Sequence, residues 1–217
     1  MAARSKVLPV PYFIQPDRET CQSTVLRMFA AYLRPRNPSA LRSDKAAIYK
    51  IRKTINSDPR RPEKELEDAH VNFRWWLSVE FPELDFEHTW STTQWEAVEW
   101  IVQHIDAGYP VISSVSHAST PGHIILIVGY RDYLPRASTV DFRFVVHDPY
   151  GQFDPVLRSN LKRDKRFVGA ACAATGGEIG PGQSVELGAD EVGRRRGKGP
   201  IAYSLISAKR QQKLTRL

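Results

Sequence analysis

The chain has 217 residues, of which 41% are hydrophobic, and this length suffices for one domain with a buried core. Its net charge of +7 is uneven, with 18 basic against 19 acidic residues over positions 1–154 and 13 against 5 over 155–217. No apolar run approaches the roughly 18 to 20 residues of a membrane-spanning helix, so we expect no membrane span.

The N-terminal residues and the two cysteines indicate the compartment in which the protein is made. Arg4 and Lys6 precede a proline-containing stretch, which lacks the apolar run and small-residue cleavage site of a signal peptide. Cys21 and Cys172 are too few for a disulfide framework and lack the nearby ligands of a structural zinc site. We therefore expect synthesis in the cytoplasm, without export by the usual route.

Helical patterns fill the first half of the chain. Prolines at 9, 11 and 16 keep the entry segment extended, and apolar residues at helical spacing then predict a helix that begins at Cys21. A threonine at 92 or 93 can cap the last helix, which Gly108 ends. The predicted helices span 21–33, 43–55, 63–81 and 94–107.

Short apolar runs separated by Ser, Pro, Gly and Asp replace this pattern after residue 108. Helices followed by strands predict a single α+β domain over 1–217, with N-terminal helices packed on a C-terminal antiparallel sheet. The predicted strands span 110–115, 123–130, 142–147 and 201–206. We interpret 156–199 as a long Gly-rich, basic loop, 200–207 as the closing strand and 208–217 as a basic tail.

Four residues have the chemistry of a thiol-dependent site. A nucleophilic thiol needs a depressed pKa, which the amide groups at the start of a helix offer to Cys21. The reaction also needs an imidazole for proton transfer, a group that orients it and a donor for the oxyanion. His123 at the head of a strand, Asp148 after another strand and Gln15, six residues before Cys21, are the candidates.

The motifs around these residues resemble the C39-like peptidase family. They are Val10-Pro11-Tyr12-Phe13-Ile14-Gln15, Cys21-Gln22-Ser23-Thr24, Gly122-His123 and Asp148-Pro149-Tyr150-Gly151, in the Gln, Cys, His, Asp order of papain-like enzymes. The similarity covers about 9–155 and 197–207. It does not cover 37–85, interpreted as a helical insertion, or 156–196, and Gln22 stands where many members have Gly.

This resemblance implies a papain-like cysteine peptidase fold with the nucleophile at a helix start. It assigns the oxyanion to Gln15, attack to Cys21, proton transfer to His123 and orientation to Asp148. It implies no metal and no organic cofactor.

Three other residues have side chains of the types that such a site uses. His117 is a rival base, although its Ser-rich surroundings favour a loop histidine. His147 precedes Asp148 on a strand, where neighbours face opposite sides, so it should point away from the site. Cys172 stands among Gly and Ala residues and is interpreted as a packing residue.

The leading hypothesis is a cysteine peptidase or amidase that forms a thioester intermediate. Similarity to phage-type members and the basic C-terminal part suggest an anionic partner and the peptide cross-bridges of peptidoglycan as substrate, with a virion or cell-wall location within a larger assembly. The alternative is a catalytically silent papain-like domain that binds a peptide or serves as a structural component. Hydrolysis, transpeptidation and deamidation stay open because a fold does not choose among them.

Overall fold

The computed structural model describes residues 2–17, 19–34, 44–63, 69–115, 122–135, 141–151, 182–195 and 201–210. His117 and Cys172 therefore lie outside the described residues. The helices are α1 (Cys21–Leu33), α2 (Asp44–Ser57), α3 (Ala69–Glu80) and α4 (Gln94–Asp106). The strands are β1 (Arg4–Val7), β2 (Leu84–Ser91), β3 (Val111–Val115), β4 (His123–Tyr133), β5 (Arg143–His147), β6 (Val185–Gly188), β7 (Arg194–Arg195) and β8 (Ile201–Arg210).

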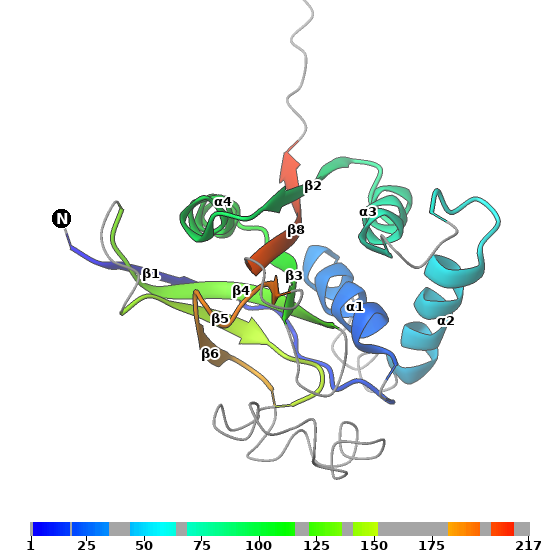
Figure 1. Cartoon of the computed structure of the whole chain (residues 1–217). Helices are drawn as coiled ribbons and strands as arrows, with labels where there is room; N and C mark the ends of the chain where they lie inside the picture. Colours follow the sequence, from blue (N-terminus) through cyan, green and yellow to red (C-terminus); the bar gives the residue numbers. More distant parts are fainter. Residues whose placement is uncertain are drawn as a thin grey trace, which may run out of the picture.

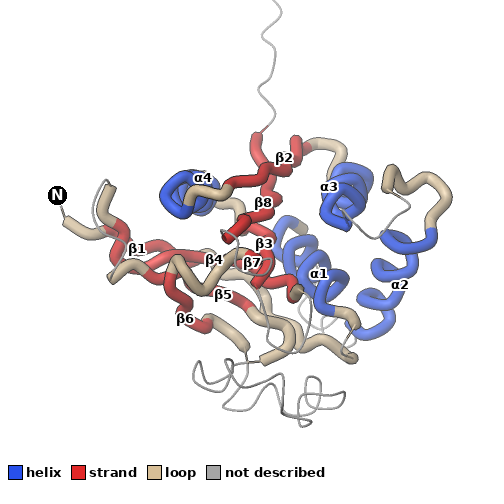
Figure 2. The backbone as a smooth tube through the Cα atoms, in the orientation of Figure 1, coloured by secondary structure: helices blue, strands red, loops and turns tan. Residues whose placement is uncertain are grey.

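The strands form a sheet in the order β2-β8-β3-β4-β5-β6, with β1 paired to β4 and β7 paired to β8. Each of these named strand pairs is antiparallel. The last strand along the chain, β8, lies between β2 and β3, so the sheet is completed by a segment distant in sequence, as expected (Figures 1 and 2).

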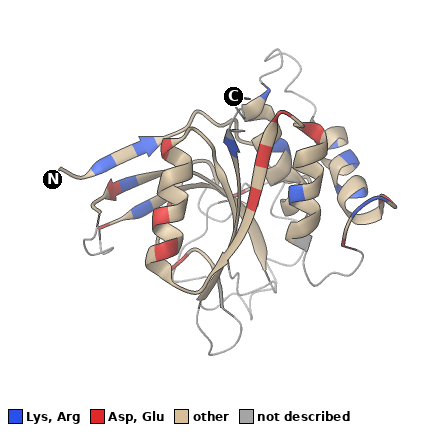
Figure 3. Cartoon of the chain, turned by 90° about the horizontal axis from the view of Figure 1, so that it is seen from above, with Lys and Arg blue, Asp and Glu red and all other residues tan. Residues whose placement is uncertain are grey.

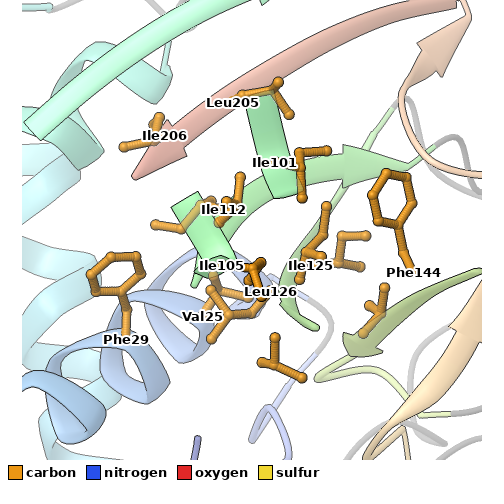
Figure 4. Packing of buried hydrophobic residues seen from close by; sticks show 14 of the residues in the cluster. Val25, Phe29, Ile101, Ile105, Ile112, Ile125, Leu126, Phe144, Leu205 and Ile206 are labelled. Carbon is orange, nitrogen blue, oxygen red and sulfur yellow. The ribbon is translucent and has the colours of Figure 1, made fainter. Parts of the chain in front are cut away.

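Helices cover the central strands. All residues of β3 and the first eight of β4 are buried, which requires a cover on both faces of the sheet centre. In Figure 1, α1 lies between the sheet and α2, and α4 lies above β1 and β4, to the left of β8. Figure 4 shows the resulting core, to which α1 contributes Val25 and Phe29 and α4 contributes Ile101 and Ile105.

The α+β architecture of helices on an antiparallel sheet is as predicted, and α1 has the predicted bounds. Four strands were not predicted, and two of them precede α4: β1 is short and mostly exposed, and the polar residues of β2 hide its strand character. The interpretation of 156–199 as a loop was wrong for its described part, because 182–195 contains β6 and β7. The Gly and charged residues of this segment give no strand pattern in the sequence. The two strands form because β6 pairs with β5 and β7 pairs with β8.

The boundary predicted for the closing strand was also wrong. β8 continues beyond 207 to Arg210, where it pairs with Leu84 at the start of β2. Ala208 is fully buried in this extension, opposite Phe86. The residues assigned to the start of a tail therefore belong to the sheet, because β2 offers backbone partners to β8 from Tyr203 to Arg210.

Charged side chains of both signs are spread over the described elements (Figure 3). Basic residues are frequent on α2, whereas α4 carries Glu96, Glu99 and Asp106. Most of the basic residues after position 155 lie outside the described residues. None of the helices in the described part of the chain combines the length and apolar character that crossing a bilayer requires.

The extension of β8 can be tested by placing a charge in it. Ala208→Asp should lower the free energy of unfolding by about 3 kcal/mol or more, because it buries an unpaired carboxylate. Lys209→Ala is the matched control: it removes a half-exposed ion pair with Glu87 and should cost less than about 1 kcal/mol. Urea unfolding of both variants checks this, and equal, small effects would show that the strand ends before Ala208.

Candidate active site

Cys21 is the first residue of α1 and is partly exposed. The preceding Thr20 anchors the helix start, because its carbonyl accepts hydrogen bonds from the Thr24 backbone N–H (2.9 Å), the Thr24 hydroxyl (2.8 Å) and the Ser23 hydroxyl (3.2 Å). The first turn contains no acidic residue. The amide groups of this turn therefore place a partial positive charge beside the thiol.

His123 and Asp148 meet across two paired strands. His123 is the first residue of β4, and Asp148 follows the last residue of β5. The His123 Nε2 atom lies 2.6 Å from Asp148 Oδ1, and both side chains are almost fully buried. The same oxygen accepts the Tyr150 backbone N–H at 2.8 Å, and the Tyr150 ring lies edge-on to the imidazole with centroids 5.7 Å apart. The imidazole is thus held in one orientation.

The Cys21 thiol and the His123 imidazole shift each other's pKa. The partial burial of Cys21 would by itself raise its pKa, but the hydrogen bond to His123, the charge of that ring and the backbone N–H groups of Ile124 and Gln22 outweigh this effect and lower the pKa. Burial would lower the pKa of His123, but the Asp148 carboxylate and the Cys21 sulfur raise it. Both directions favour a thiolate–imidazolium pair. Since Nε2 is held by Asp148, Nδ1 is the nitrogen left for the thiol.

Gln15 is fully buried in the extended segment that leads to α1. Its backbone N–H donates to the carbonyl of Pro149 at 3.0 Å, which ties this segment to the residue after Asp148. Its side-chain Nε2 donates to the carbonyl of Asp17 at 2.7 Å. Within the described part of the chain, the buried Oε1 atom of this amide has no hydrogen-bond partner, and Nε2 carries a second N–H beyond the one that Asp17 accepts.

A second set of contacts holds the Asp148 backbone. The Tyr12 hydroxyl donates to the Asp148 carbonyl and accepts the Gly182 N–H, each at 3.0 Å, and Asp148 N–H donates to the Gly182 carbonyl at 2.8 Å. A Cβ atom at Gly182 would lie 2.0 Å from the Asp148 carbonyl oxygen, so this approach requires glycine. Burial raises the pKa of Tyr12 to about 12, which keeps its hydroxyl protonated as a donor.

His147 packs on the other side of the strand, as expected. Its Nδ1 accepts the Ser184 backbone N–H at 3.1 Å, which leaves Nε2–H to donate to the Val10 carbonyl at 2.9 Å. Burial lowers the pKa of His147, consistent with a neutral ring. This histidine joins the entry segment to the sheet without taking part in the site.

The structure therefore brings Cys21, His123 and Asp148 into one chain of contacts and ties Gln15 to it through Pro149. Sequence reasoning missed the supporting roles of Tyr12, Tyr150 and Gly182. Tyr12 and Tyr150 lie within the motifs that resemble the family, so the sequence could have indicated their roles. No pattern in the sequence indicates the role of Gly182. In the described residues, no group of three or more His, Cys, Asp or Glu side chains could hold a metal ion.

Comparison with known proteins agrees with this geometry. Residues 7–170, well over half of the chain, match the family described as Peptidase_C39 like family. The chain belongs to the C39-like peptidase family. No curated protein matches it in sequence.

A solved structure extends the comparison to the fold. The crystal structure of UfSP from C. elegans is similar over 96% of this chain, with 12% identity and a TM-score of 0.52. This chain spans only 35% of that one. Family and fold together establish a papain-like α+β fold and support a cysteine peptidase.

The titration of Cys21 gives a direct test of the pairing. Because its pKa is lowered, Cys21 should react with iodoacetamide at about pH 6, where an ordinary thiol such as that expected for Cys172 is protonated. His123→Ala removes the hydrogen bond and the charge and leaves the effect of burial, so the alkylation midpoint should move to higher pH. Mass spectrometry against pH measures both sites. An unchanged Cys21 profile in the variant would show that His123 does not activate the thiol.

Proposed function

We propose that this C39-like family member is a cysteine hydrolase that cleaves a peptide or amide bond, with Cys21 as nucleophile, His123 as acid and base, Asp148 as orienting group and Gln15 as oxyanion donor. The observation that carries the proposal is the continuous contact from the thiol at the start of α1 through the buried His123 to Asp148. A core cysteine would not require an imidazole and a carboxylate in line with it.

The first half of the reaction forms a thioester. The Cys21 thiolate attacks the carbonyl carbon, and the developing oxyanion is stabilised by the Cys21 backbone N–H and by the second N–H of Gln15 Nε2. When the C–N bond breaks, His123 gives its proton to the leaving amine. The enzyme is then acylated on sulfur, and the imidazole is neutral.

The second half restores the enzyme. His123 takes a proton from a water molecule, which attacks the thioester and releases a carboxylic acid product and the Cys21 sulfur. Asp148 stays ionised throughout, because it orients the ring and stabilises its charged form. Its burial and its bond to the Tyr150 N–H keep the carboxylate fixed while the ring gains and loses its proton.

Substitution of Cys21, His123 and His117 tests the assignment of catalytic roles. Cys21→Ala and His123→Ala should each reduce turnover to background, because members of one catalytic unit are not additive. Cys21→Ala should leave the thermal midpoint close to that of the parent, since its side chain is partly exposed and small. His117→Ala is the control and should retain most of the activity.

The same experiment separates the proposal from a silent binding domain. Peptide binding to the parent chain without any Cys21-dependent cleavage would favour the binding domain. Activity that survives in His123→Ala but is lost in His117→Ala would transfer the role of base to His117.

We further propose that the substrate is a peptide carried by an anionic polymer, such as the cross-bridge of peptidoglycan, met as part of a phage assembly or at the cell wall. The support for this is the excess of basic over acidic residues over 155–217. Long-range attraction to such a polymer weakens as salt screens it, whereas bond cleavage in a small neutral peptide does not depend on that attraction.

Salt dependence therefore tests the substrate class. Between about 0.05 M and 0.5 M NaCl the Debye length falls by roughly threefold, so release of peptide from purified cell walls should fall several-fold. Cleavage of a short neutral peptide should change little over the same range. Equal salt dependence for both substrates, or no release from cell walls at low salt, would count against an anionic polymer.

A further inference from the structure

Asp17 links the proposed oxyanion donor to the start of the nucleophile helix. Its carbonyl accepts hydrogen bonds from Gln15 Nε2 at 2.7 Å and from the Thr20 hydroxyl at 2.9 Å. Its carboxylate accepts the Glu19 N–H at 2.8 Å, and its own N–H donates to the Thr20 hydroxyl at 3.3 Å. A shift of Asp17 would therefore move the Gln15 amide and the residue that precedes Cys21 together.

Helix α2 holds this link from outside. The Tyr49 hydroxyl donates to Asp17 Oδ2 at 2.6 Å, and Arg52 forms an ion pair with Glu19. Tyr49 and Arg52 are three residues apart and so share one face of α2. Burial would raise the pKa of Asp17, but the Tyr49 hydrogen bond, the Glu19 N–H and the Arg52 charge lower it, so the acceptor is ionised at neutral pH.

We infer that Tyr49 of α2 is a positioning residue for the active site, which acts through Asp17 to hold the Gln15 amide where the oxyanion forms. This inference rests on the proposed function. It assigns a role to α2, which the sequence motifs left as part of an insertion and which lies within the residues 7–170 that match the family. Arg52 supports the same contact through Glu19.

The contacts favour this role over a simple surface tether. Tyr49 is 37% exposed, so its hydrogen bond contributes little to the stability of the fold. The Asp17 carbonyl, however, is the acceptor that sets the plane of the buried Gln15 amide. Catalysis is far more sensitive than folding to the placement of such a donor, because a displacement of about 1 Å can cost about 10²-fold in rate.

Tyr49→Phe tests the role, because it removes the hydroxyl and keeps the ring. We expect kcat to fall about 3- to 10-fold with KM changed less than twofold, as for a donor that acts mainly on the transition state. The matched control is Glu83→Ala, which removes another exposed inter-element contact, to Arg34 at 2.7 Å, away from the site. That variant should keep the parent kcat.

A double-mutant cycle distinguishes positioning from a general structural effect. If Tyr49 acts through Gln15, Tyr49→Phe should have no further effect on kcat in a Gln15→Ala background. Independent, multiplicative losses in the double variant would overturn the inference, as would an unchanged kcat in Tyr49→Phe.

Hydrogen exchange makes the test independent of turnover. Tyr49→Phe should speed amide exchange in the segment 15–20, while Glu83→Ala should leave that segment at the parent rate. If the parent chain shows no hydrolysis but the segment still loosens in Tyr49→Phe, the proposed function fails and the contact from α2 stands. Unchanged exchange in the segment overturns the contact itself, whatever the activity.

Discussion

The hydrogen bond between His123 and Asp148 is the interaction on which the site depends. Both groups are nearly fully buried, and a buried charge is unfavourable unless a partner compensates it. Each therefore needs the other, and the backbone N–H of Tyr150 supplies a further donor to the carboxylate. The close approach of Gly182 and the Tyr12 hydroxyl fix the Asp148 backbone, so the pair is held by main chain as well as side chains.

This buried pair determines the state of the thiol. The carboxylate favours the charged imidazole, and the charged imidazole favours the thiolate against the opposing effect of burial. The start of α1 acts in the same direction through its amide groups. Two elements far apart in the sequence, a helix start and a pair of strand ends, thus act on one sulfur atom. Their mutual position comes from the packing of α1 on β4.

Helices α2 and α3 are integrated into this framework. Ile51 and Ile55 of α2 and Phe73, Trp76 and Leu77 of α3 belong to the same hydrophobic core as the strands. The buried Asn72 joins the two helices, because its side chain donates to the carbonyls of Ile55 (3.0 Å) and Glu63 (2.8 Å). A helix anchored in this way can hold the loop before Cys21 with little motion of its own. Through the contact from Tyr49 to Asp17, a helix that is fixed in the core therefore restrains the loop before Cys21.

The sequence by itself determined the α+β class, the bounds of α1 and the identity of Cys21, His123 and Asp148 as candidates, because these depend on local periodicity and on rare residue types at element ends. Only the tertiary structure decided that β8 runs to Arg210, that β6 lies within a Gly-rich segment and that Gly182 and Tyr12 support Asp148. These features depend on partners distant in the chain. A strand without strong alternation of apolar and polar residues forms because a neighbouring strand offers its backbone groups. A glycine is required because the carbonyl of another residue approaches it closely. Neither cause is local to the residues concerned.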